Sequence, residues 1–178
     1  MKKKHNIFGG GSQTNKNGLS FERDTSLNEA LISAGYIIKA EKVYDRNNKI
    51  IGLSIPKNDL YKKYLEKQNI NYKDYNSKKW LPDDAFLNFN NKTIYIIEKK
   101  YQQTSGSVDE KLPNCDFKKK EYEKLFNPLN IDVEFIYVFN NWFKNSQYDD
   151  ILKYITDVGC MYYYNEIPFN ALGLEKDN

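Results

Sequence analysis

Two short stretches decide the fold: residues 82–87, which read PDDAFL, and residues 96–101, which read IIEKKY. Apolar residues dominate the strand-like part of each stretch, and Asn90 and Asn91 lie midway between them. Asparagine is a favoured residue of tight turns that join antiparallel strands. The pattern therefore predicts a β-hairpin with a two-residue turn at Asn90 and Asn91.

In this register Asp83 faces Glu98 across the hairpin, and Lys100 shares their face because side chains alternate along a strand. Two like charges on facing strands destabilise each other unless they have a partner. A hard divalent cation such as Mg²⁺, which takes carboxylate and water oxygens, would supply that partner, and Mn²⁺ is expected to substitute for it. Such a metal polarises a phosphoryl group and activates a bound water, which Lys100 would position. The pattern predicts phosphodiester hydrolysis, with Asp83 and Glu98 as metal ligands and Lys100 as the assisting cation.

The doubled aspartate leaves a second register open. A three-residue turn would place Asp84 opposite Glu98, because a slip of one residue turns every side chain to the other face. We favour the two-residue turn, since asparagine tolerates the positive φ that such a turn needs. Lys99 then lies on the opposite face, where we expect it to be exposed to solvent. Acids followed by lysine are also common on ordinary solvated strands, so a surface without chemistry remains an alternative.

Outward from the hairpin, hydrophobic periodicity predicts alternating helices and strands. The predicted helices cover residues 19–34, 59–68, 117–126 and 148–158. The predicted strands cover residues 36–38, 49–53, 83–89, 93–101, 133–139 and 161–164, the first two forming a hairpin. This order is typical of an α/β fold with a mixed central sheet flanked by helices. We expect a flexible N-terminal arm over residues 1–18, a single catalytic domain over residues 19–174 and a tail over residues 175–178.

Composition excludes several kinds of protein. The chain has 178 residues, 27 basic and 24 acidic, so its net charge of +3 permits a nucleic-acid partner without requiring one. No window approaches the roughly 20 apolar residues of a membrane helix, so no membrane partner is expected. Cys115 and Cys160 are too few and too far apart for a disulfide framework, and His5 is the only histidine. These features favour a cytoplasmic protein whose chemistry depends on carboxylates, lysines and an oxygen-loving metal.

The segment from Pro82 to Lys100 resembles the signature of the PD-(D/E)xK nuclease superfamily, and the chain as a whole resembles small type II restriction endonucleases. Further stretches carry the same resemblance, which covers most of residues 15–174. They are NKNGLSFE at 15–22, SKKWLPD at 77–83, QQTSGSVDEKL at 102–112 and CDFKKK at 115–120.

The resemblance implies a restriction-endonuclease-like core and Mg²⁺-dependent cleavage of both strands of double-stranded DNA, leaving 5′-phosphates. It also implies a homodimer, since a palindromic site mirrors a two-fold protein, and a cognate DNA methyltransferase in the same system. Glu22 occupies the helix where such enzymes often carry a further metal-binding glutamate. A glutamate in the first turn of a helix also interacts favourably with the helix dipole, which is the plainer reading.

DNA contacts are expected on the segments after the second strand. The candidates are Gln102, Ser107, Lys111, Lys118 and Lys119. Gln102 could also orient Lys100, and an ordinary polar residue at the end of a strand is an equal alternative. A run of lysines is often only a solvated helix face. Two rival functions stay open: a DNA-repair or junction-resolving nuclease of the same superfamily, and a non-catalytic DNA-binding module.

Overall fold

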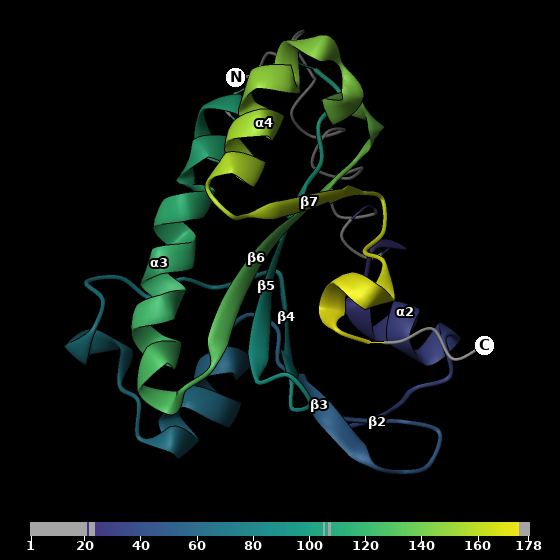
Figure 1. The fold of residues 1–178 in the computed structure, drawn as a ribbon, viewed down its shortest axis with the longest axis vertical. Coiled ribbons are helices and arrows are strands. Elements are labelled where there is room, and N and C mark those ends of the chain that lie inside the picture. The colour runs from purple at the N-terminus through teal and green to yellow at the C-terminus, as the bar shows by residue number, and fades with distance from the viewer. Residues whose placement is uncertain (1–20, 22–23, 105, 107, 175–178) are drawn as a thin grey trace, which may run out of the picture.

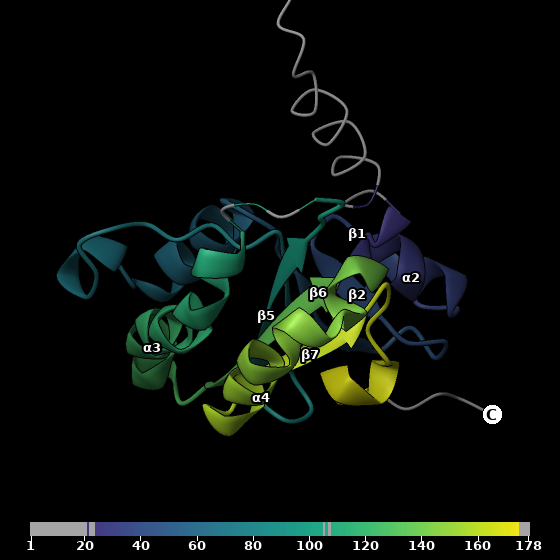
Figure 2. The same ribbon diagram turned by 90° about the horizontal axis from the view of Figure 1, so that it is seen from above.

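A computed structural model describes residues 21, 24–104, 106 and 108–174, which fold around one mixed β-sheet (Figures 1 and 2). The sheet has seven strands in the order β1-β2-β3-β4-β5-β6-β7. The strands are β1 (Ile37–Lys39), β2 (Lys42–Tyr44), β3 (Ile50–Ser54), β4 (Asp84–Asn88), β5 (Thr93–Lys100), β6 (Asp132–Phe139) and β7 (Met161–Tyr164). Neighbours from β1 to β5 are antiparallel, whereas β5, β6 and β7 run parallel. The prediction of a mixed central sheet flanked by helices is confirmed.

Helices cover both faces of this sheet. The α-helices among the described residues are α2 (Leu27–Ser33), α3 (Cys115–Phe126) and α4 (Asp149–Asp157). Shorter helical segments are the π-helix η1 (Leu60–Leu65) and the 3-10 helices η2 (Glu66–Gln68), η3 (Tyr72–Asp74), η4 (Asp109–Asn114), η5 (Asn127–Leu129), η6 (Asn141–Lys144), η7 (Ser146–Tyr148) and η8 (Phe169–Leu172). In Figures 1 and 2, α3 and α4 lie on one face, and α2 and η8 lie on the other.

The strand β6 shows why both faces need a cover. Parallel strands are joined by crossovers that place helices on the sheet, so they are buried on both sides and read as continuous apolar runs. Phe135, Tyr137 and Phe139 of β6 point into the core under α3 and α4. Ile136 and Val138 point into a second core, which α2 and η8 cover. The chain therefore has one hydrophobic core on each side of the sheet.

The N-terminal helix differs from its prediction. The pattern predicts one helix over residues 19–34, but α2 begins only at Leu27, after a break at Thr25 and Ser26. The Ser26 hydroxyl accepts a hydrogen bond from the Glu29 backbone amide at 3.5 Å, so serine caps the new helix. The predicted arm and tail lie outside the described residues.

The predicted hairpin over residues 36–53 is wrong in its pairing. A strand that the sequence analysis missed, β2, pairs with β1 on one side and β3 on the other. The turn between β1 and β2 passes through Ala40, whose φ is +55°. Alanine seldom adopts this left-handed conformation, so no residue of the usual turn-forming kind marks the reversal in the sequence.

Candidate active site

The hairpin formed by β4 and β5 has the predicted register. Asp84 pairs with Ile97, Ala85 with Ile96 and Leu87 with Ile94. This pairing confirms the register that we favoured and excludes the slip that would place Asp84 opposite Glu98.

The turn itself is longer than predicted. Four residues, 89–92, connect the paired residues Asn88 and Thr93, and the positive φ falls on Lys92, at +54°, and not on an asparagine. The asparagines act through their side chains instead. Asn88 Oδ1 accepts from the Asn90 backbone amide at 2.8 Å, and Asn91 Oδ1 accepts from that of Thr93 at 3.2 Å. A four-residue loop over residues 89–92 has the same centre as the predicted two-residue turn. The predicted register is therefore correct, although the predicted length of the turn is wrong.

Alternation along the hairpin assigns each charged residue to a face. Ala85 and Ile96 belong to the core under α3, so Glu98 and Lys100, which alternate with Ile96, lie on that face. Phe86 and Ile97 belong to the core under α2, and Lys99 lies on that second face. The two faces carry separate sets of ion pairs.

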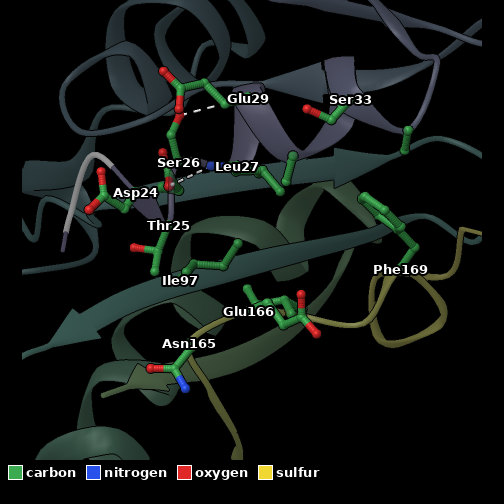
Figure 3. A pocket seen from close by; sticks show the side chains of 14 residues that line it. Asp24, Thr25, Ser26, Leu27, Glu29, Ser33, Ile97, Asn165, Glu166 and Phe169 are labelled. Carbon is green, nitrogen blue, oxygen red and sulfur yellow. Dashed lines mark hydrogen bonds between the residues drawn. The ribbon is translucent and has the colours of Figure 1, made fainter. Parts of the chain in front are cut away.

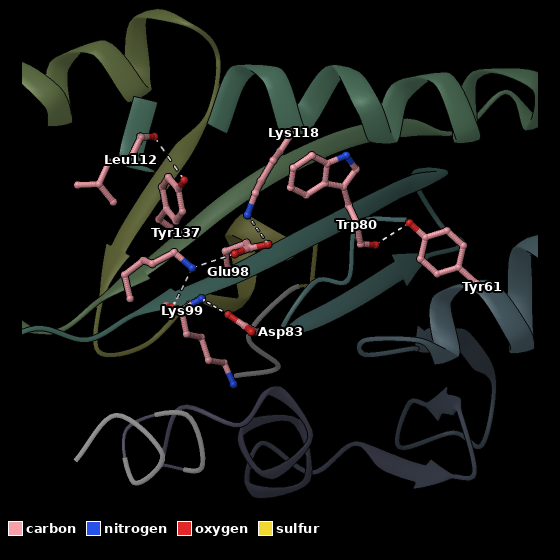
Figure 4. Close-up of polar contacts among 9 residues, drawn as sticks. Tyr61, Trp80, Asp83, Glu98, Lys99, Leu112, Lys118 and Tyr137 are labelled. Carbon is pink, nitrogen blue, oxygen red and sulfur yellow. Dashed lines mark hydrogen bonds and ion pairs between the residues drawn. The ribbon is translucent and has the colours of Figure 1, made fainter. Parts of the chain in front are cut away.

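On the α3 face, Glu98 is buried and holds two ammonium groups (Figure 4). Its Oε2 lies 2.8 Å from Lys100 Nζ, and its Oε1 lies 3.0 Å from Lys118 Nζ of α3. Burial raises the pKa of the Glu98 carboxyl, but the charges and hydrogen bonds of the two lysines outweigh burial and hold that pKa below its usual value. Glu98 is thus an ionised carboxylate at neutral pH.

Asp83 lies at the entrance of β4, next to the same face. Its Oδ2 accepts a hydrogen bond from the Lys99 backbone amide at 2.7 Å, which fixes the carboxylate against β5 (Figure 4). Tyr122 of α3 is close enough for the charges of both Asp83 and Glu98 to act on its pKa, which burial and these carboxylates raise well above the usual value. The Tyr122 hydroxyl is buried and has no hydrogen-bond partner within the described part of the chain.

Asp84 and Lys99 form a separate ion pair on the α2 face. Asp84 Oδ2 lies 2.6 Å from Lys99 Nζ, and the same oxygen accepts a long hydrogen bond, 3.4 Å, from the Leu27 backbone amide. The Lys99 side chain is only 5% exposed. The expectation that Lys99 is solvent-exposed is therefore wrong, because α2 covers this face and Asp84 compensates the buried charge.

The donor set suits a hard divalent cation. Asp83 and Glu98 offer two carboxylates beside a buried phenol, and Mg²⁺ is usually held by one or two carboxylates together with water and substrate phosphate. Among the residues that the structure describes, no three His, Cys, Asp or Glu side chains form a metal-binding group. The third predicted ligand, Glu22, lies outside them. The residues present thus fit a metal that completes its coordination with water and phosphate oxygens.

The predicted DNA-contacting lysines lie in three different environments. Lys111 is exposed on η4. Lys118 points into the site, onto Glu98. Lys119 points away from it, with its Nζ 3.3 Å from Glu134 Oε2 and 2.8 Å from the Gly159 carbonyl oxygen. The run of lysines at the start of α3 is therefore not one continuous solvated face.

Gln102 follows β5 and is buried, and neither amide atom of its side chain has a hydrogen-bond partner among the residues that the structure describes. Its backbone is tied to the side chain of Asn140, at 3.2 Å through the amide and 2.8 Å through the carbonyl oxygen. The remaining DNA-contact candidate, Ser107, lies outside the described residues.

Sequence reasoning missed the surroundings of Glu98. The Trp80 ring lies close to two ammonium groups: Lys78 Nζ is 4.3 Å and Lys118 Nζ 5.6 Å from the ring centroid. Because Lys118 also contacts Glu98, the ring lies beside the Glu98 carboxylate. Tyr122 lies one helical turn after Lys118, and this spacing of four residues is the signal that places both on one face of α3.

An open pocket of about 520 Å³ lies on the α2 face (Figure 3). Its wall includes Asp84, Ile97 and Ser26, together with residues 165–167 and Phe169. Asp83, Glu98 and Lys100 do not line it. The pocket is thus separate from Asp83 and Glu98.

Comparison with known proteins gives one match. Residues 83–126, which run from Asp83 through β4, β5 and α3, match the family model of the PD-(D/E)XK nuclease superfamily domain. The predicted resemblance to this superfamily is confirmed, and the match indicates a nuclease. No curated protein and no solved structure matches the chain. None of the described helices has the length and apolar character needed to cross a membrane.

Proposed function

We propose that the chain is a Mg²⁺-dependent type II restriction endonuclease, which hydrolyses both strands of double-stranded DNA at a short site and leaves 5′-phosphates. The observation that carries the proposal is the buried Glu98, with the ammonium of Lys100 held 2.8 Å away, next to Asp83, whose carboxylate the Lys99 backbone amide fixes against β5 at 2.7 Å. The superfamily match supports the nuclease class, and the wider resemblance of the chain to type II enzymes supports the finer assignment.

Each residue has a role that follows from its contacts. Asp83 and Glu98 would hold the metal, which when bound polarises the scissile phosphate and lowers the pKa of a coordinated water. Lys100, kept in place by Glu98 and by the Lys99 carbonyl oxygen at 3.1 Å, brings a positive charge to the attacked phosphate and orients the water. The hydrogen bond from the Lys99 amide orients Asp83 before any metal arrives, which lowers the cost of binding.

The proposal includes partners. One site of this kind cuts one strand, so two copies of the chain would act as a homodimer on a palindromic duplex. A cognate DNA methyltransferase would protect the host sites. Gln102, Ser107, Lys111, Lys118 and Lys119 remain the proposed DNA contacts, and Glu22 remains the proposed third metal ligand.

Cleavage of unmethylated phage DNA tests the proposal. We expect discrete fragments with Mg²⁺ or Mn²⁺, none after chelation, and DNA binding without turnover in Ca²⁺. Sequencing of the fragment ends should return one short site. Cleavage confined to branched or mismatched DNA would favour the repair or junction-resolving rival, and binding without cleavage in any metal would favour the non-catalytic module.

A pair of neighbouring variants tests the site itself. Asp83→Asn should abolish cleavage, because it removes a metal ligand. Asp84→Asn, on the other face, should keep a substantial fraction of the activity after correction for the folded fraction. The reverse result would contradict the assignment of Asp83.

A further inference from the structure

Glu98 has both of its oxygens occupied by ammonium groups. Lys100 lies on Oε2 and Lys118 on Oε1, and the two lysine side chains are only 21% and 18% exposed. A divalent cation that coordinates Glu98 needs at least one of these oxygens. Because an ammonium and a metal ion on one oxygen repel each other strongly in a site that is partly shielded from water, one lysine has to leave when a metal binds.

The two lysines are not equally free to leave. Lys100 extends from the same strand as Glu98 and has a second acceptor, the Lys99 carbonyl oxygen at 3.1 Å. Lys118 reaches across from α3, and within the described part of the chain Glu98 is its one ionic or hydrogen-bond acceptor. Its other contact is with the ring of Trp80, 5.6 Å away, which accommodates a cation without fixing it.

We propose that Lys118 exchanges with the metal on Glu98. Without metal, Lys118 neutralises the buried carboxylate. With metal bound, its ammonium leaves Oε1 and binds a DNA phosphate beside the site. The identity of that anion rests on the proposed function, whereas the competition with the metal does not.

This exchange couples metal binding to DNA binding. A phosphate that attracts Lys118 frees Oε1 for the metal, and a metal on Oε1 frees Lys118 for the phosphate. The two ligands must then favour each other by the same factor, since coupling between sites is reciprocal. Metal would load readily only when DNA is present.

The test compares Lys118→Met with Lys120→Met in the full chain. Both variants lose one positive charge from α3, but Lys120 is exposed and pairs with Asp116, away from the site. Mn²⁺ affinity is measured without DNA, from the spectroscopic signal of free Mn²⁺. We expect Lys118→Met to bind Mn²⁺ about tenfold more tightly than the unchanged protein, because its competitor on Glu98 is gone. Lys120→Met should match the unchanged protein.

A second measurement follows DNA binding to an uncleaved duplex, in Ca²⁺ and in chelator. Lys118→Met should weaken binding about fivefold in Ca²⁺, with about one unit less salt dependence, and should leave binding in chelator unchanged. Lys118→Arg should restore most of the Ca²⁺-dependent affinity. If Lys118→Met fails to fold, Lys118→Gln, which keeps most of the side-chain volume, gives the same comparison.

Three results would overturn the exchange: Mn²⁺ affinity of the Lys118 variant no higher than that of Lys120→Met, no Mn²⁺ binding by either, or equal loss of DNA affinity with and without divalent metal. Failure of the proposed function has a different signature. In that case no DNA would be cleaved, yet the gain in Mn²⁺ affinity would still appear.

Discussion

Replacement of Lys99 by methionine should destabilise the protein strongly, although strand alternation directs this side chain away from the proposed catalytic face. Lys99 Nζ lies 2.6 Å from Asp84 Oδ2, and the two side chains are 5% and 14% exposed. Methionine keeps the aliphatic stem but leaves the Asp84 carboxylate without its partner. Loss of one member of a buried pair costs about 3–5 kcal/mol. Since Asp84 is partly exposed and keeps the Leu27 amide, we expect a loss of about 2–4 kcal/mol in the free energy of unfolding.

The measurement is urea unfolding monitored by tryptophan fluorescence, in chelator. Lys153→Met is the matched control, since it breaks an ion pair of similar length, 2.5 Å to Asp157, whose side chains are 72% and 57% exposed. Because solvent screens exposed pairs of this kind, we expect a much smaller loss from Lys153→Met than from Lys99→Met. Adding Asp84→Asn to Lys99→Met removes the uncompensated charge and should recover at least half of the loss. A Lys99→Met protein within about 0.5 kcal/mol of the Lys153→Met control would refute the reasoning.

Three further predictions concern the strands β3, β4 and β5. Lys100→Ala should keep DNA affinity in Ca²⁺ within a few-fold but lose at least about two orders of magnitude in single-turnover cleavage rate, because it removes the positioned charge; an undiminished rate would exclude Lys100 from the chemistry. Glu98→Gln should flatten the acid limb of unfolding free energy against pH, measured in chelator. The lowered pKa means that ionised Glu98 stabilises the fold above its usual value of 4.5 and that this contribution is lost as pH falls through the folded-state pKa, so parallel curves for the two proteins would argue against it. Gly52→Ala should cost about 3 kcal/mol or more by urea unfolding, since an added Cβ would lie 2.2 Å from the Leu87 carbonyl oxygen; a neutral effect would mean that β3 and β4 separate easily.

The sequence was sufficient where the determining interactions are local. The period of two along residues 83–88 and 93–100 sets the faces of the hairpin, and the centre of the turn sets its register. Both were therefore predictable without the length of the loop. Burial was not predictable in this way, since alternation gives the face of Lys99 but not the helix that covers it. The contact of Lys118 with Glu98 depends on how α3 lies on the sheet, and a run of lysines gives no sign of which one points inward. The strand β2 was missed because the turn that joins it to β1 contains no glycine, proline or asparagine.

The connection from β5 through α3 to β6 also bears on the order in which the site forms. Hairpin contacts between β4 and β5 are close in sequence, and such contacts form early in folding, before parallel strands that need a long crossover. Asp83 and Glu98 should therefore meet in a partly folded chain before α3 delivers Lys118. During that interval the two carboxylates are less shielded and open to metal, so divalent ions present during refolding should accelerate formation of the hairpin and delay the docking of α3.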